Sequence, residues 1–115
     1  MSESTQQTQQ TQPSQQMQQS QQTHQLCEAL AALKDSSEVQ AFLEDLCTIK
    51  EIREFGQRLE TARLLTAGKS YQEVTGTLQV SSATISRVNK ALNYGSGGYA
   101  QALEAIKERG NLGDE

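Results

Sequence analysis

Hydroxyls and cations gather on one face of a predicted helix that begins near Ser82. At helical spacing its outward positions are Ser82, Ala83, Ser86, Arg87, Asn89 and Lys90. None of these residues is acidic, and none is large and apolar. A helix that enters the major groove of DNA needs such a surface, because the groove excludes bulk and the phosphates repel anions. Arg87 is best placed for a bidentate contact to a guanine edge.

Two predicted helices position this face. The run Ser70–Glu73 is a capping-box sequence that starts a helix of about eight residues, and Ser81 or Ser82 caps a second helix that ends near Leu92. Apolar residues stand where two steeply crossed helices would touch and in the turn between them, at Val74, Leu78, Val80, Ile85 and Val88. This spacing is typical of a helix-turn-helix in the C-terminal half of the chain. Gln79 departs from the common pattern, which has glycine in the turn.

The remaining segments predict an all-α fold of about six helices, since no stretch alternates polar and apolar residues like a strand. Two short helices are expected at about Leu26–Lys34 and Glu38–Leu46, with capping groups in Asp35-Ser36-Ser37 between them. A long helix follows the capping box that Thr48 opens, and Gly68 is placed to end it in a left-handed conformation. A glycine-rich loop over Asn93–Gly98 precedes a last helix at about Tyr99–Arg109.

Composition divides the chain of 115 residues into three segments. Residues 1–25 contain twelve glutamines and two apolar side chains, Met1 and Met17, so we predict a disordered tail. Residues 26–110 form the predicted folded domain, and residues 111–115 a disordered C-terminus. No apolar run is long enough to cross a membrane, and the N-terminus lacks the features of a secretory signal. We therefore expect a cytoplasmic protein with no membrane partner.

The formal net charge of -4 argues against a nucleic-acid partner for the chain as a whole. The charge is unevenly distributed, however, because the segment from Lys69 to Tyr94 carries a net +2, whereas Leu26–Glu54 carries a net -4. The basic segment can meet phosphate while the acidic segment stays in solvent. The residues expected to contact DNA are Lys69, Ser81, Ser82, Ala83, Ser86, Arg87 and Lys90, and the bound protein would be associated with the nucleoid.

Enzymatic and metal chemistry have little support. The single histidine, His24, lies in the glutamine-rich segment, and no paired carboxylates or phosphate-binding loop can be recognised. We predict no enzyme, no cofactor and no metal site. Cys27 and Cys47 occupy apolar positions of predicted helices, which indicates reduced core thiols.

Three segments resemble the Trp repressor family: Thr48–Gly68, Ser70–Leu92 with its run Ala83-Thr84-Ile85-Ser86-Arg87, and the loop Asn93–Tyr99. The loop is similar to that of the YerC/YecD branch of Trp-repressor-like proteins. The resemblance implies an intertwined all-α homodimer that presents two recognition helices to successive major grooves. The expected function is a sequence-specific transcriptional regulator, a repressor, that binds double-stranded DNA. The alternative is a helical protein-interaction or dimerisation module that keeps the fold without reading DNA.

The resemblance also implies an effector pocket at Thr48, Arg58 and Arg87, which match the family's corepressor-binding residues in type. Two departures argue against tryptophan as the effector. Val88 stands where the family has a glycine beside the indole, and Ala91 stands where a serine helps to hold the ligand's amino group. We therefore expect a different small-molecule effector, or none.

Each pocket residue also has a simpler interpretation. Thr48 can serve as the helix cap alone, and Arg87 can be a DNA contact alone. Arg58 can pair with Glu54 or Glu51 on its own helix, a surface contact of roughly 0.3–0.5 kcal/mol.

Overall fold

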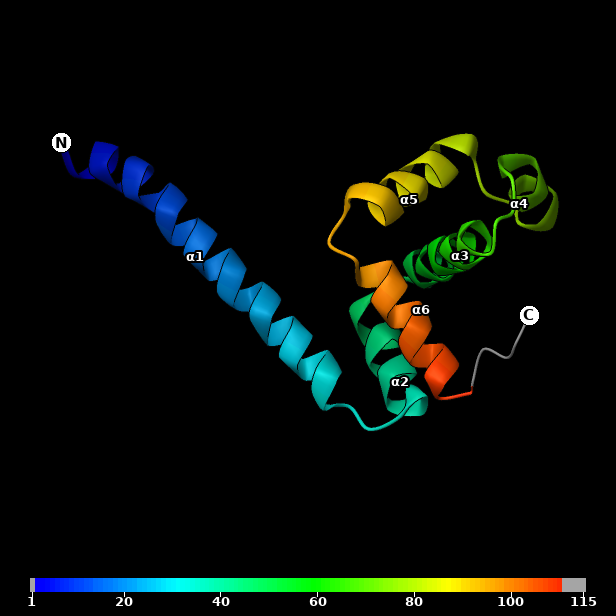
Figure 1. The fold of residues 1–115 in the computed structure, drawn as a ribbon. Coiled ribbons are helices and arrows are strands. Elements are labelled where there is room, and N and C mark those ends of the chain that lie inside the picture. Colours follow the sequence, from blue (N-terminus) through cyan, green and yellow to red (C-terminus); the bar gives the residue numbers. More distant parts are fainter. Residues whose placement is uncertain (1, 111–115) are drawn as a thin grey trace. The chain divides into compact units, whose positions relative to one another are not determined.

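The computed structural model describes residues 2–110, which form six helices and no strand (Figure 1). The predicted all-α fold with six helices is confirmed. The chain divides into two compact units, one ending at Leu46 and the other beginning at Cys47. The predicted disordered C-terminus, residues 111–115, lies outside the described residues.

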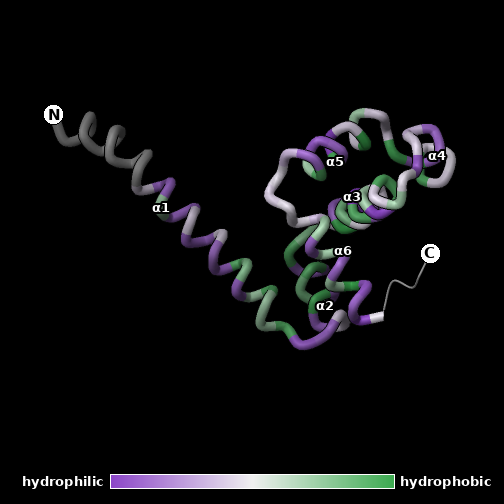
Figure 2. The backbone as a smooth tube through the Cα atoms, viewed as in Figure 1, coloured by the Kyte–Doolittle hydropathy of each residue, from purple (hydrophilic) through white to green (hydrophobic). Residues whose placement is uncertain are grey.

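The first unit begins with a long helix, α1, which spans Ser2–Ala32. The sequence predicted a helix only from Leu26, so the structure places helix where a disordered tail was expected. Glutamine is a good helix former, and a helix satisfies its backbone groups without a partner. Every described side chain from Ser14 to Ala29 is exposed, and Figure 2 shows the hydrophilic character of most of this stretch. The helix is therefore held by its own backbone hydrogen bonds.

The second helix, α2, spans Ser36–Leu46. The predicted cap is confirmed at Asp35, whose Oδ1 accepts from the Glu38 N–H at 2.9 Å, while Glu38 Oε1 accepts from the Lys34 N–H at 2.8 Å. The apolar side chains of α2 are at most half-buried, and Leu46 is 50% exposed. In this unit the N-terminus of α2 is capped, but the apolar face of the helix is not completely buried.

The second unit begins with α3, Ile49–Thr66, the 18-residue helix that the sequence predicted. Its capping box is confirmed: Thr48 Oγ1 accepts from the Glu51 N–H at 3.0 Å, and Glu51 Oε1 accepts from the Thr48 N–H at 2.8 Å. The helix ends at Thr66, and Gly68, just after the C-cap Ala67, has a φ of 92°, the predicted left-handed conformation.

Three shorter helices follow: α4 spans Tyr71–Thr77, α5 spans Ser82–Tyr94 and α6 spans Gly98–Glu108. The fifth helix runs two residues beyond its predicted end at Leu92, which shortens the glycine-rich loop to residues 95–97. A side chain at Gly95 would place its Cβ 2.5 Å from the Ala91 carbonyl oxygen, so the chain can leave α5 at this angle only with glycine. Gly97 then starts α6 with a φ of 82°.

The core of the second unit consists of two clusters that share α3 and α5. The first, which we call the α4 cluster, joins the buried side chains of Leu64, Val74 and Ile85, with Leu65, Leu78 and Val80 packed against them. The second, the α6 cluster, joins the buried side chains of Ala62, Val88 and Leu103, with Leu59, Leu65, Leu92 and Tyr99 packed against them.

Two sequence-based assignments need correction. Val88 was expected between the two helices of the helix-turn-helix, but it packs in the α6 cluster, because it lies about 60° around α5 from Ile85 at a spacing of three residues. Cys27 was expected in a core, but its residue is exposed, and Cys47 is half-buried; both thiols are free. Cys27 lies on the apolar side of its helix, but no other helix of the first unit covers this position, so the thiol stays exposed.

Candidate nucleic-acid interface

The helices α4 and α5 form a helix-turn-helix whose two helices are joined by buried apolar side chains. Val74 on α4 and Ile85 on α5 are both 0% exposed and lie in one cluster. Leu78 ends α4 in an extended conformation, with φ -119° and ψ 150°. In residues 2–110 a positive φ occurs only at glycines, so the turn does not need a glycine where Gln79 stands. The departure noted in the sequence therefore causes no strain.

The N-terminus of α5 is capped by Ser81. Its Oγ accepts from the Thr84 N–H at 3.1 Å and donates to Thr84 Oγ1 at 3.0 Å. The amides of Ser82 and Ala83 belong to the first turn, where a helix offers its N–H groups no acceptor of its own. Together with the positive end of the helix dipole, these amides make a suitable anchor for a phosphate.

The predicted contact residues on α5 are accessible and share a side of the helix. Ser82, Ala83, Ser86, Arg87 and Lys90 are all exposed, whereas Ile85 and Val88 on the inner side are buried. Lys69, just before α4, is exposed as well. The structure thus brings the α5 residues onto one surface, which we call the α5 face, as their spacing predicted.

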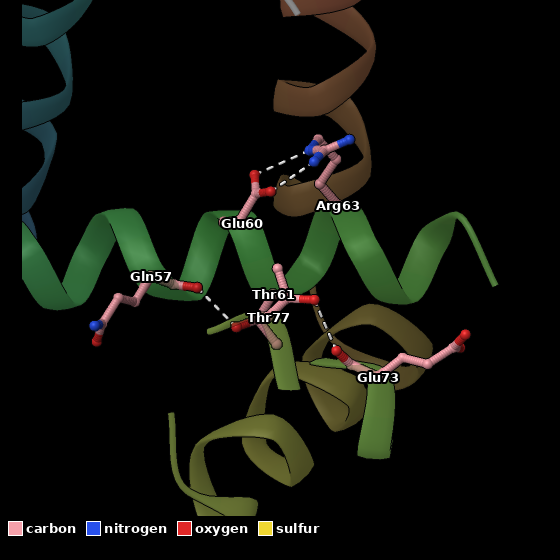
Figure 3. A network of polar contacts seen from close by, with 6 residues as sticks. All are labelled: Gln57, Glu60, Thr61, Arg63, Glu73 and Thr77. Carbon is pink, nitrogen blue, oxygen red and sulfur yellow. Dashed lines mark hydrogen bonds and ion pairs between the residues drawn. The ribbon is translucent and has the colours of Figure 1, made fainter. Parts of the chain in front are cut away.

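The single acid of this segment, Glu73, is committed to the cap of α4. Its Oε1 accepts from the Ser70 N–H at 2.8 Å, and that hydrogen bond is the main reason why the pKa of Glu73 lies below its ordinary value. Two threonine hydroxyls of α4 are occupied in the same way, since Thr77 Oγ1 donates to the Glu73 carbonyl at 2.9 Å (Figure 3) and Thr75 Oγ1 donates to the Gln72 carbonyl at 3.0 Å. These polar groups are engaged within α4, and the segment Lys69–Tyr94 keeps a net charge of +2 with Glu73 counted as ionised.

Sequence reasoning missed the exposed side chains that flank these caps. Tyr71 and Gln72 open α4, and Gln79 lies in the turn before α5; all three are exposed. Their position next to the two N-caps was the available signal, because residues in first turns and in the connecting turn point outward when the helices pack by their apolar faces.

The long helix α3 supports the pair from behind. Thr61 is 0% exposed, and its hydroxyl donates to the Gln57 carbonyl at 2.7 Å, which satisfies the buried oxygen (Figure 3). On either side of Thr61 in the sequence, Arg63 and Glu60 are joined by two hydrogen bonds of 2.9 and 2.6 Å. The Arg63 side chain is the main reason why the pKa of Glu60 is lowered. The buried Thr61 hydroxyl is thus satisfied within α3, and the Glu60–Arg63 pair is an interaction within the same helix.

The predicted effector residues have separate local roles. Thr48 is exposed and caps α3, the guanidinium of Arg58 lies 5.1 Å from the centre of the Phe55 ring, and Arg87 belongs to the exposed α5 face. Val88 is 0% exposed within the α6 cluster, so its side chain fills the space beside the α5 backbone. A ring lying against that backbone would have to displace it.

A shallow depression lies where α3, α5, α6 and the glycine loop meet. It has a volume of about 410 Å³ and is lined by Leu59, Ala91, Ser96, Gly98, Tyr99 and Ala102. No ionisable carboxylate or cation lines it, and its only hydroxyls are those of Ser96 and Tyr99. Within residues 2–110 no group of three or more residues is arranged to hold a metal ion, and none of the described helices could span a membrane.

Residues 21–107 match the family model described as Trp repressor protein. The chain belongs to the Trp repressor family. It is 46% identical over 83 residues to a Bacillus subtilis (strain 168) protein, YerC, which is described as uncharacterised; the match covers 72% of this chain and 80% of YerC. The resemblance of the sequence to this family and to its YerC-like members is thus confirmed.

Two solved structures share the fold. A TrpR-like protein from Eubacterium eligens superposes with a TM-score of 0.71 and 40% identity, over 82% of this chain and 94% of that one. A Staphylococcus aureus protein described as a candidate Trp repressor superposes with a TM-score of 0.70 and 33% identity, over 74% of this chain and 85% of that one. The family is one of regulators with a helix-turn-helix and not a family of enzymes, which agrees with the arrangement of α4 and α5.

Proposed function

We propose that this Trp repressor family member is a sequence-specific DNA-binding transcriptional regulator that acts as a homodimer, represses transcription, and works in the cytoplasm on nucleoid DNA. The observation that carries the proposal is the α5 face. It is exposed, free of acids and rich in short hydrogen-bonding side chains, and its helix is fixed by two buried clusters. A rigid helix with such a surface fits the major groove.

The contacts divide into two kinds. Lys69, Lys90 and the first-turn amides next to Ser81 bind phosphates and fix the orientation of the protein on the duplex. Ser82, Ala83, Ser86 and Arg87 meet base edges, with Arg87 bidentate to a guanine. The exposed amides of Gln72 and Gln79 extend the phosphate-contacting border of this surface.

The apolar surface that the two units leave open supports the homodimer. Leu26 and Leu46 in the first unit are 37% and 50% exposed, and Ile49 and Phe55 in the second are 73% and 44% exposed. Large apolar side chains left on exposed helix faces favour a partner that covers them. A second copy of the chain supplies one, and a dimer also places two α5 faces at the spacing of a two-fold operator.

The decisive experiment captures bound genomic DNA and then measures fluorescence anisotropy with the recovered fragment at several salt concentrations. For Arg87→Ala we expect a loss of roughly 1–3 kcal/mol in binding and relaxed preference for one base pair. For Lys90→Ala we expect weaker binding to all sequences and a salt dependence reduced by about one phosphate contact. Lys107→Ala, which removes an exposed cation from the last turn of α6, is the matched control and should bind like the wild type.

Failure of every fragment to bind in a salt-dependent way would sink the proposal. The protein would then be a dimerisation or protein-interaction module, and its partner binding would survive both the Arg87 and the Lys90 substitution. Equal losses in the Lys107 control would show that net charge, and not the α5 face, determines binding.

We do not extend the proposal to tryptophan. If a small-molecule effector exists, Arg58 and Arg87 are the residues proposed to hold its anionic group, with Thr48 as a further contact. Because Val88 fills the space beside α5, we expect tryptophan to leave both the melting temperature and the DNA affinity unchanged. A tryptophan-dependent rise in either one would overturn this view.

A further inference from the structure

The glutamine-rich segment has an order that its composition conceals. From Thr5 to Gln25 the chain reads as triplets in which a Ser, Thr or Met is followed by two glutamines. The triplets begin at Thr5, Thr8, Thr11, Ser14, Met17, Ser20 and Thr23, and only Pro13 and His24 interrupt the glutamine pairs. A repeat of three residues differs from both helical packing periods, the 3.6 of a straight helix and the 3.5 of a coiled coil.

This period explains why α1 buries no side chain between Ser14 and Gln25. In an α-helix each step of three residues falls about 60° short of a full turn, so the Ser, Thr and Met positions wind around the helix instead of forming a stripe. Every described side chain from Ser14 to Gln25 is exposed. Seven of the twelve residues from Ser14 to Gln25 are glutamines, and each amide offers two donors and an acceptor.

The chemistry of the segment excludes two classes of partner. Residues 1–33 contain no Lys or Arg, so the segment lacks the cations that supply most of the affinity for phosphate. Met1 and Met17 are the only apolar side chains before Leu26, which is too little for a lipid surface or an apolar groove. What remains is a neutral array of amides and hydroxyls, and the surface that matches such an array is another copy of itself.

We propose that residues 5–25, which we call the arm, associate with the arms of other copies through hydrogen bonds between glutamine side chains. Each such bond contributes little in water, so binding needs many of them. Between Glu3 and His24 there is no charged side chain to oppose like arms, and a glutamine-rich composition is prone to self-association. A shift of three residues brings the same residue types together again, so the pairing has many equivalent registers.

Because the arms can pair in many equivalent registers, we expect an open-ended assembly and not a closed oligomer. A closed oligomer needs one fixed interface, whereas arms with equivalent registers join in open-ended, weak contacts. This association is separate from the homodimer, because it uses side chains outside the apolar faces of both units. It links protein copies without DNA, and so it does not rest on the proposed function.

Sedimentation velocity of the full chain without DNA, over a wide range of protein concentration, tests the arm. We expect the average sedimentation coefficient of the wild type to rise continuously without a plateau. The triple variant Gln16→Glu, Gln19→Glu and Gln22→Glu places like charges along the arm, and we expect it to lose this rise entirely. A matched control adds the same three charges at exposed glutamines of the second unit, at Gln72, Gln79 and Gln101, and should behave like the wild type.

Three results would overturn the proposal. They are a wild type whose sedimentation does not change with concentration, an arm variant that still assembles, and a control that loses assembly together with the arm variant. Thermal unfolding of each variant is followed by circular dichroism. A transition like that of the wild type shows that the second unit of the variant is folded. The proposal is supported if the wild type and the control assemble and the arm variant does not.

Discussion

The two units differ in how completely they bury their apolar side chains. From Cys47 onward, four helices converge on two buried clusters, and Val74, Ile85 and Val88 are fully inaccessible. Before Leu46, two helices carry no fully buried residue among those whose burial is described. Capped helices occur in both units, at α2 in the first and at α3, α4 and α5 in the second, so the difference lies in tertiary packing. Caps set where a helix begins, but buried contacts between helices decide whether a unit can stand alone.

The largest effect is expected from breaking the α4 cluster. Ile85→Ala removes a side chain that is 0% exposed and leaves a cavity beside Val74 and Leu64, so the second unit should lose about 2–5 kcal/mol of stability. Denaturant unfolding followed by circular dichroism measures this loss. Ser86→Ala, on the neighbouring exposed position, is the control and should stay within about 0.5 kcal/mol of the wild type. Similar losses in both variants would contradict the assignment of Ile85 to the core.

A smaller effect is expected in the first unit, and it should appear as altered association. Leu46→Glu places a charge on an apolar residue that is 50% exposed, so we expect the dimer to dissociate at least about tenfold more readily, near 1.4 kcal/mol. The wild type should melt at a temperature that rises with protein concentration, and the variant should lose that dependence. Gln72→Glu on α4 adds the same charge without touching an apolar face. A dimer equally weakened by that change would show that Leu46 is not in the interface.

The smallest effect concerns acid. The pKa of Glu60 is lowered by Arg63, so the ion pair stabilises the fold at pH values above the unfolded carboxyl pKa of about 4.3. This contribution is lost as the pH falls through the lower, folded pKa. Because the pair lies partly in solvent, its loss is worth about 0.3–0.5 kcal/mol. Glu60→Gln should lower stability at neutral pH by that amount and no longer at pH 2, as measured by urea unfolding at both pH values. Equal destabilisation at the two pH values would indicate a packing effect.

The sequence predicted what depends on neighbours along the chain. The capping boxes at Thr48 and Ser70 and the left-handed Gly68 were predicted correctly, because hydrogen bonds within four residues fix them. The grouping of the α5 face was predicted by helical periodicity. Contacts between residues distant in the sequence were predicted less well. Val88 of α5 was expected to contact α4, because periodicity identifies the inner face of a helix without saying which helix covers it. The extent of α1 was missed because composition measures the ability to bury surface, whereas a glutamine-rich helix exists without burying any.

The sharing of α5 between two clusters has a mechanical consequence. Ile85 ties the helix to α4, and Val88, three residues on, ties it to α6. A rotation of α5 about its own axis would therefore have to break both contacts, so the helix has one angular setting. The α5 face moves only as a rigid body together with α3. Under the proposed function, accommodation to operators with different half-site spacings comes from bending or twisting of the DNA.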